Sequence, residues 1–124
     1  EKIVGIDARG FVFGAVLAYQ LNIGFVPVRK KGKLPHKTVS ASYTLEYGEA
    51  TVEMHQDGLE KGEKVLIVDD LIATGGTIGA AIDLVEKLGG DIVECAFVVE
   101  LPDLKGREQL RGHKMFTITE FEGE

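Results

Sequence analysis

The stretch VLIVDDLIATGGT, residues 65–77, constrains the possible fold more than any other part of the chain. Its first four residues are aliphatic, so both faces of a strand there would be apolar, which is typical of a central strand in a parallel sheet. Asp69 and Asp70 follow, and the stretch ends on Thr-Gly-Gly-Thr, although adjacent acids repel each other and adjacent glycines lose backbone entropy on folding. We infer that the sequence accepts these costs because the residues form a ligand site.

Apolar runs alternate with helical patterns along the whole chain. Strands that alternate with single helices form right-handed crossovers, so the pattern predicts an α/β fold with a mainly parallel central sheet flanked by helices. The expected strands are Ile3–Asp7, Phe25–Lys30, Thr51–His55, Val65–Asp69, Ile92–Leu101 and Phe116–Phe121. The expected helices are Phe11–Leu21, Ile78–Leu88 with Gly89 as its C-terminal stop, and a short one over Leu104–Leu110.

One segment departs from this compact alternation. Residues 31–49 lie between two expected strands and contain GKLPHK and SASYTLEYG. Loops of that length are usually lids or binding loops, or else they are disordered. We therefore expect a functional or disordered loop here.

The length and charge of the chain limit the classes of protein that it can represent. Its 124 residues predict a single domain, 1–124. The net charge of −6 argues against a general nucleic-acid-binding surface. RKKGK, residues 29–33, nevertheless places four cations in five positions, which favours a local anion site, with a solvated loop as the alternative.

Cysteine, histidine and hydropathy patterns add further expectations. Cys95 is the only cysteine and lies in the apolar run IVECAFVV, so we expect a buried, inert thiol and a reducing cytoplasm as the compartment. His36, His55 and His113 have no metal-binding spacing and are expected at the surface. No apolar run is long enough for a membrane helix, and no signal-peptide pattern is present.

The end of the aliphatic run predicts the chemistry of the site. In an open parallel sheet, ligands bind beyond the carboxyl ends of the strands, where Asp69 and Asp70 are expected. The loop that follows leads into a helix, whose backbone N–H groups and N-terminus attract phosphate. We infer a phosphorylated sugar, with the acids on ribose hydroxyls and the loop on the 5-phosphate. The loop residues are Ala73, Thr74, Gly75, Gly76 and Thr77.

Other motifs explain this stretch less well. The sequence has no G-x-x-x-x-G-K-[ST] loop for a nucleoside triphosphate and no G-x-G-x-x-G for a dinucleotide. A phosphorylation receiver domain would place its paired acids near the N-terminus and needs more chain after them. A helix capped after a strand explains one acid or one threonine, but not the whole run.

Residues 65–77 resemble the phosphoribosyl-pyrophosphate signature of the type I phosphoribosyltransferases. GIDARGFVFG (5–14), VRKKGKLP (28–35), SYTLEYG (42–48) and LKGREQL (104–110) are similar to the adenine-specific members of that family, and the resemblance covers nearly the whole chain. It implies the type I phosphoribosyltransferase fold with a flexible lid loop. The family's chains carry a further N-terminal part with a hood over the base, which we expect to be missing here.

The resemblance also implies a role for each matched position. Asp69 and Asp70 match the ribose-binding acids, and Ala73–Thr77 matches the 5-phosphate loop. Two further groups match positions that bind pyrophosphate, and some of the cations in the second group are expected to serve the partner subunit of a dimer. The groups are Asp7, Ala8 and Arg9, followed by Gly10, with a cis bond expected at Asp7–Ala8, and the cations Arg29, Lys30 and Lys33.

Residues 42–48 match the family's mobile lid. The resemblance makes Glu46 the catalytic residue that exchanges a proton with the base, and Tyr47 the residue that covers the sugar. The implied reaction is purine salvage: a phosphoribosyl group moves from phosphoribosyl pyrophosphate to adenine, giving AMP and pyrophosphate. The resemblance further implies a homodimer and Mg²⁺ held mainly by substrate phosphates, with no dedicated protein metal site.

Two alternatives stay open at this point. A phosphoribosyl-pyrophosphate-sensing transcriptional regulator on the same fold would share the acidic signature but would not need Glu46. A xanthine or hypoxanthine-guanine phosphoribosyltransferase would differ in the base, and its main discriminator lies in the expected hood.

Overall fold

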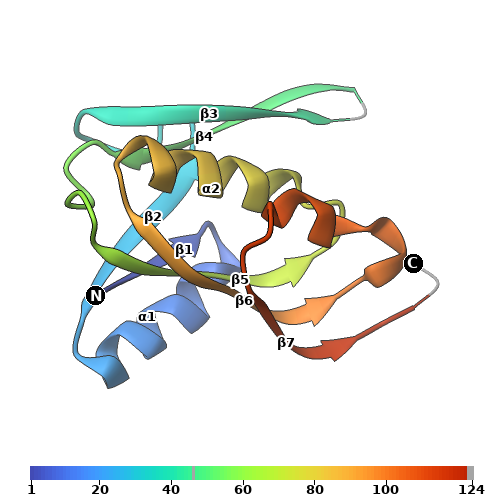
Figure 1. Ribbon diagram of the computed structural model, residues 1–124. Helices are drawn as coiled ribbons and strands as arrows, with labels where there is room; N and C mark the ends of the chain where they lie inside the picture. The colour runs from blue at the N-terminus through green and yellow to red at the C-terminus, as the bar shows by residue number, and fades with distance from the viewer. Residues whose placement is uncertain (46, 123–124) are drawn as a thin grey trace.

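The computed structural model describes residues 1–45 and 47–122, arranged around one seven-stranded sheet (Figure 1). In chain order its elements are β1 Lys2–Ile6, α1 Arg9–Leu21, β2 Gly24–Lys30, β3 Thr38–Leu45, β4 Gly48–His55, β5 Lys64–Ile72, α2 Gly76–Lys87, β6 Asp91–Glu100, the 3₁₀ helices η1 Pro102–Leu104 and η2 Gly106–Leu110, and β7 Met115–Glu120. The strand order across the sheet is β3-β4-β2-β1-β5-β6-β7.

The five neighbouring strands β2, β1, β5, β6 and β7 pair in parallel. The antiparallel hairpin of β3 and β4 extends the sheet beyond β2, because β4 pairs antiparallel with β2. The aliphatic strand β5 lies in the middle of the parallel part, between β1 and β6, and its Ile67 is fully buried. The predicted α/β fold with a mainly parallel sheet is thus confirmed.

Helix α2 is buried on more than one side. It lies between the parallel sheet and the β3–β4 hairpin (Figure 1), and seven of its residues are buried. The hairpin contributes Ala41, Val52 and Met54 to the same core cluster as Ile82 and Leu84 of the helix. The helix is therefore buried against the hairpin as well as against the sheet.

The expectation of a long loop over residues 31–49 is wrong for most of that segment. Strand β3 pairs with β4 over its whole length, from Thr38↔His55 to Leu45↔Gly48. Its residues alternate between exposed hydroxyl side chains and the inward-facing Val39, Ala41 and Tyr43. Small and polar residues hide this alternation in the sequence, because the strand is stabilised by its partner strand and by α2 rather than by an apolar run of its own.

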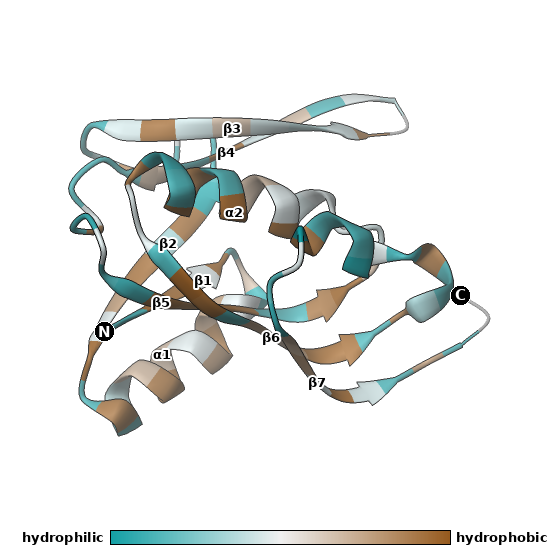
Figure 2. Ribbon diagram, in the orientation of Figure 1, coloured by the Kyte–Doolittle hydropathy of each residue, from teal (hydrophilic) through white to brown (hydrophobic). Residues whose placement is uncertain are grey.

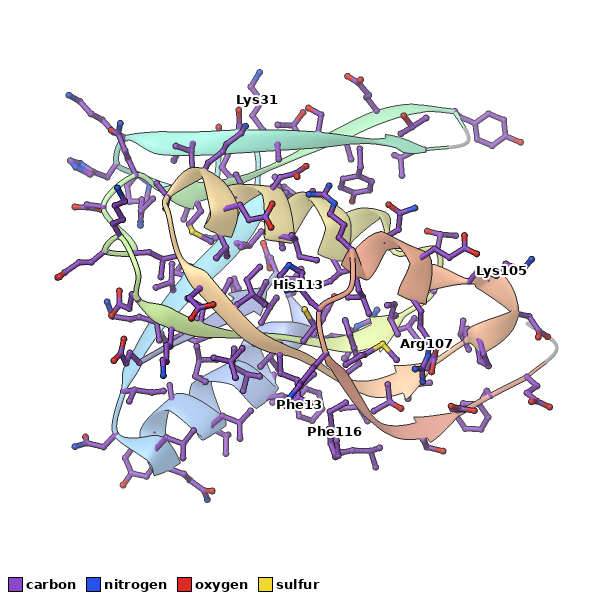
Figure 3. The ribbon with its side chains drawn as sticks, viewed as in Figure 1. Phe13, Lys31, Lys105, Arg107, His113 and Phe116 are labelled. Carbon is purple, nitrogen blue, oxygen red and sulfur yellow. The ribbon has the colours of Figure 1, made fainter. Side chains whose placement is uncertain are left out.

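The opposite face of the sheet is only partly covered, by α1. Beyond that helix an apolar hollow of about 540 Å³ runs over β5, β6 and β7. Phe13 of α1 and Phe116 of β7, both labelled in Figure 3, line it. Exposed apolar residues on this side also include Val16 and Ile118, and the brown segments of α1 in Figure 2 show the same pattern.

Two of the expected surface histidines are partly buried. His36 is exposed, but His55 and His113 are half-buried. The His55 Nε2 atom is buried without a hydrogen-bond partner among the described residues, and its ring faces that of His36 at 6.3 Å between centroids. His55 ends β4 opposite Thr38 of β3, and the Gln56 N–H donates to the Lys37 carbonyl at 2.8 Å, a pairing that the sequence did not reveal. None of the described helices is long and apolar enough to cross a membrane.

Cys95 occupies the middle of β6 and is fully buried, as expected. Burial raises the pKa of its thiol to about 12. A disulfide-forming reagent at pH 8 should therefore modify the native chain at least about 10³-fold more slowly than the denatured chain, because thiolate and access are both lacking. The measurement is the release of the reagent's chromophore, with Cys95→Ala as the blank. Rapid modification of the native chain would contradict the packing of β6.

Candidate active site

A polar cavity of about 260 Å³ opens at the carboxyl ends of β1 and β5. Two segments of the chain line it, residues 6–9 after β1 and residues 69–78 after the aliphatic part of β5. The aliphatic run and the loop before α1 thus bring together residues that are some 60 positions apart in sequence. This is the sheet edge where the sequence placed the site.

The cavity exists because β1 stops pairing with β5 several residues before β6 does. The pairing of β1 with β5 ends at Gly5↔Val68, whereas the pairing of β5 with β6 continues to Ile72↔Glu100. Strand β5 is therefore longer than the expected Val65–Asp69, and both acids lie within it. Past Val68, the edge of β5 that faces β1 has no strand partner, so it borders the cavity.

The segment after β1 turns sharply away from the sheet. The Asp7–Ala8 peptide bond is cis, which confirms the expectation drawn from the resemblance. The Asp7 backbone N–H donates to the Val28 carbonyl at 2.9 Å, and helix α1 begins directly afterwards, at Arg9. This turn places Arg9 opposite the acids of β5.

Residues 73–77 form a loop around the N-terminus of α2. Gly75 is the residue before the helix and has φ +88°, a left-handed conformation that favours glycine. No side chain caps this helix end, so its first-turn N–H groups are available to a ligand. Together with the positive end of the helix dipole, they make this helix end suitable for an anion such as a phosphate.

Arginines and acids alternate around the cavity. The Arg9 Nε lies 2.7 Å from an Asp70 carboxylate oxygen, and the Arg29 Nε donates to Asp7 at 3.2 Å. The Asp70 N–H donates to Asp69 at 2.8 Å. The Arg9 side chain is still 76% exposed, so it can turn from Asp70 to an anionic ligand.

Asp69 has an unusual proton affinity. Burial raises its pKa to about 7, and the side chain of Asp70 beside it acts in the same direction. The hydrogen bond from the Asp70 N–H and the charge of Arg9 offset part of that rise. Near neutral pH the acidic pair therefore holds a proton on some molecules, and a ligand whose hydroxyl groups donate to both acids would favour its release.

Comparison with known proteins identifies this arrangement. The sequence model of the family described as "Phosphoribosyl transferase domain" matches residues 2–123. The chain belongs to the phosphoribosyltransferase family. An adenine phosphoribosyltransferase of Desulfosudis oleivorans is 69% identical over the whole chain and 72% of its own length.

Solved structures agree with this assignment. An adenine phosphoribosyltransferase from Thermoanaerobacter pseudethanolicus has a TM-score of 0.95 and 51% identity, over 98% of this chain and 70% of its own. One from Trypanosoma brucei, in complex with AMP, pyrophosphate and ribose-5-phosphate, has a TM-score of 0.88 and 32% identity, over 96% and 55%. The resemblance to adenine-specific phosphoribosyltransferases is thus confirmed.

The structure brings most of the predicted phosphoribosyltransferase site residues into one cavity. Arg29 adjoins it through Asp7, whereas Lys30 and Lys33 are exposed and are not among the described residues that line it. Tyr47 is 93% exposed at the end of the hairpin, away from the cavity. Glu46 lies outside the described residues. The residues that meet in the cavity are Asp7, Ala8, Arg9, Asp69, Asp70, Ala73, Thr74, Gly75, Gly76 and Thr77.

Sequence reasoning missed several neighbours of the phosphate loop, Leu71 and Tyr43 among them. Leu71 also lines the cavity, and its position inside the signature was the only signal for it. Tyr43 of β3 accepts a hydrogen bond from the Thr77 hydroxyl at 3.2 Å, and its ring lies against Gly76. Nothing local in the sequence predicts this contact, because it depends on the hairpin packing on α2.

The pKa of Asp69 predicts a pH-dependent stability. Because the folded pKa lies above the ordinary value of 3.8, the free energy of unfolding should fall as pH rises from about 4 to about 7 and then level off. Asp69→Asn removes this loss, so the variant should be more stable than the parent at pH 8 by roughly 1–2 kcal/mol, with partial exposure limiting the gain. Urea titrations at several pH values test this, with the exposed Asp57→Asn as the control. A constant difference between Asp69→Asn and the parent from pH 4 to pH 8 would contradict it.

The conformation of Gly75 predicts how a substitution there affects ligand binding. A Cβ at this position would lie 2.7 Å from the Gly106 carbonyl oxygen, and the left-handed φ is unfavourable for a β-branched residue. Gly75→Val should shift the loop and weaken the binding of AMP and of phosphoribosyl pyrophosphate together, by about tenfold or more. Gly62→Val, at a positive φ with no neighbour within 4 Å of the added Cβ, is the matched control. Calorimetric titration with unchanged affinity in Gly75→Val would refute this position for the 5-phosphate.

Proposed function

We propose that the chain transfers the phosphoribosyl group of phosphoribosyl pyrophosphate to adenine, releasing pyrophosphate and forming AMP in purine salvage. The observation that carries this proposal is the shared cavity, in which a helix-end phosphate loop and two strand acids face the Asp7–Arg9 turn. The names of its relatives agree with this reaction.

The cavity suits the parts of the sugar substrate. The loop 73–77 receives the 5-phosphate, and the ribose hydroxyls donate to Asp69 and Asp70. The pyrophosphate lies at the turn 7–9, where Arg9 can offer two parallel N–H groups. Arg29, Lys30 and Lys33 supply further positive charge around the leaving group.

An adjoining hollow of about 470 Å³ suits the base. Its lining is mainly apolar and consists of Leu71, Val98 and Val99 together with Val12 and Phe13 of α1. Asp70 and Arg9 also line it, so the hollow adjoins the polar cavity. A planar purine packs favourably on such aliphatic side chains. In this position a ring nitrogen faces the sugar bound in the polar cavity.

The reaction is a displacement at the anomeric carbon of the ribose. A ring nitrogen of adenine forms the new bond as the bond to the pyrophosphate oxygen breaks, through a transition state with oxocarbenium character. The carboxylates of Asp69 and Asp70 stabilise the positive charge that develops on the sugar. Glu46 exchanges the proton of the base, and Tyr47 covers the sugar when the hairpin closes.

The residues in the cavity are compatible with Mg²⁺. No group of three or more His, Cys, Asp or Glu residues in the described parts of the chain could hold a metal by itself. Mg²⁺ prefers oxygen ligands and usually binds through one or two carboxylates and substrate phosphates, and Asp69 and Asp70 offer such oxygens beside the pyrophosphate site. When bound, the ion would neutralise charge on the leaving pyrophosphate.

The remaining expectations form part of the same proposal. Residues 1–124 act as one catalytic core domain, and the enzyme works as a cytoplasmic homodimer. The lone buried thiol of Cys95 agrees with a reducing compartment. The exposed apolar residues Val16 and Tyr19 of α1 offer a surface for a second subunit.

Turnover of the full-length protein with phosphoribosyl pyrophosphate and each purine base tests this function. Glu46→Gln should lower kcat by about 10²–10⁴-fold and leave the dissociation constant for phosphoribosyl pyrophosphate nearly unchanged, because only proton transfer is lost. Glu49→Gln, an exposed residue of the same hairpin, is the matched control.

Each alternative predicts a different result of this assay. Tight sugar-phosphate binding without turnover would favour the regulator. A preference for xanthine, hypoxanthine or guanine would replace adenine as the substrate. A normal kcat in Glu46→Gln would remove Glu46 from the mechanism.

A further inference from the structure

Glu100 at the end of β6 is the only polar or charged residue classed as buried among residues 1–45 and 47–122. Arg107 of η2 binds its carboxylate with two hydrogen bonds, from Nε at 2.7 Å and from Nη2 at 2.8 Å. Glu120 of β7 lies 3.8 Å from the same guanidinium. The forked, charge-assisted geometry makes the Arg107–Glu100 pair a strong and well-oriented contact.

The pair holds η2 directly behind the phosphate loop. Glu100 pairs across the sheet with Ile72, the residue before the loop, and the Leu101 N–H donates to the Ile72 carbonyl at 2.9 Å. In Figure 3 Arg107 reaches from η2 toward the ends of these strands. Two elements support the phosphate loop, strand β5 and η2, and Glu100 contacts both of them.

The contact between η2 and the loop is made by two glycines. A Cβ on Gly106 would overlap the carbonyl oxygen of Ala73, and a Cβ on Gly75 would come within 2.7 Å of both the Gly106 carbonyl oxygen and the side chain of Gln109. The two backbones therefore pack without an intervening side chain. Any shift of η2 moves the loop.

Other anchors of η2 act elsewhere. Leu110 is buried in the core, and Arg111 pairs with Asp83 and Glu86 of α2 in a partly exposed position, where ion pairs contribute little. Among the hydrogen bonds and ion pairs of residues 1–45 and 47–122, the Arg107–Glu100 pair is the one that joins a side chain of η2 to β6 beside Ile72.

We propose that Arg107 and Glu100 are positioning residues that hold the backbone of residues 73–76 at the place where the 5-phosphate binds. This inference rests on the proposed function of that loop. The glycine-rich loop has no side-chain cap of its own, so its place depends on what supports it. Neither residue touches the substrate, and the pair acts through Gly106 and Gln109.

The test uses ribose 5-phosphate and adenine as separate probes of the chain. The variant E100Q/R107M removes both charges while keeping similar shapes, so that no buried carboxylate is left unpaired. Its affinity for ribose 5-phosphate should fall by about tenfold to 10²-fold, and KM for phosphoribosyl pyrophosphate should rise by a similar factor, with kcat and adenine affinity nearly unchanged. Lys2→Met, which breaks an ion pair with Glu63 at the far end of β5, should change none of these.

The outcomes separate this inference from the proposed function. Parent-like affinity for ribose 5-phosphate in E100Q/R107M would overturn the positioning role and leave the function standing, as would equal losses for both probes. Should the double variant not fold, Arg107→Lys decides, because it keeps the charge but not the fork. Arg107→Lys should lose affinity for ribose 5-phosphate but not for adenine, by a smaller factor than the double variant. Parent-like affinity of Arg107→Lys for ribose 5-phosphate would again overturn the positioning role. Absence of ribose 5-phosphate binding by the parent chain would refute both proposals.

Discussion

The unequal pairing of β5 with its two neighbours is the constraint on which the site depends. On one side β1 stops pairing at Val68, and on the other β6 continues to Ile72. The four residues after Val68, up to and including Ile72, pair with β6 along one edge and border the cavity along the other. Asp69 and Asp70 are therefore presented on rigid backbone rather than on a loop, which favours precise contacts to a sugar.

The charges around this edge are arranged before any ligand is present. Arg9 neutralises Asp70, Arg29 neutralises Asp7, and the burial of Asp69 favours its protonated form. A phosphorylated sugar would replace these internal contacts with its own, since its hydroxyl groups suit the acids and its phosphates suit the arginines and the end of α2.

Elements that are distant in sequence support the phosphate loop from two sides. Tyr43 of the β3–β4 hairpin contacts Gly76 and Thr77, and η2 packs behind Ala73 and Gly75. The hairpin also carries the segment that resembles the family's lid, so that segment and the loop belong to elements that are in direct contact. The loop is thus the junction between the sheet, the hairpin and η2.

The sequence by itself determined the features that are local. The aliphatic run, the acids and the Gly-Gly turn are contiguous, so the central strand, the helix after it and the phosphate loop followed from spacing, and the resemblance supplied the cis bond at Asp7–Ala8. Only the tertiary structure decided β3, whose Ser and Ala residues become a strand through pairing with β4 and packing on α2. It likewise decided the burial of Glu100 with Arg107 and the place of Leu71 in the cavity. The physical reason is that these features depend on contacts between separate elements, which residue spacing along one segment does not encode.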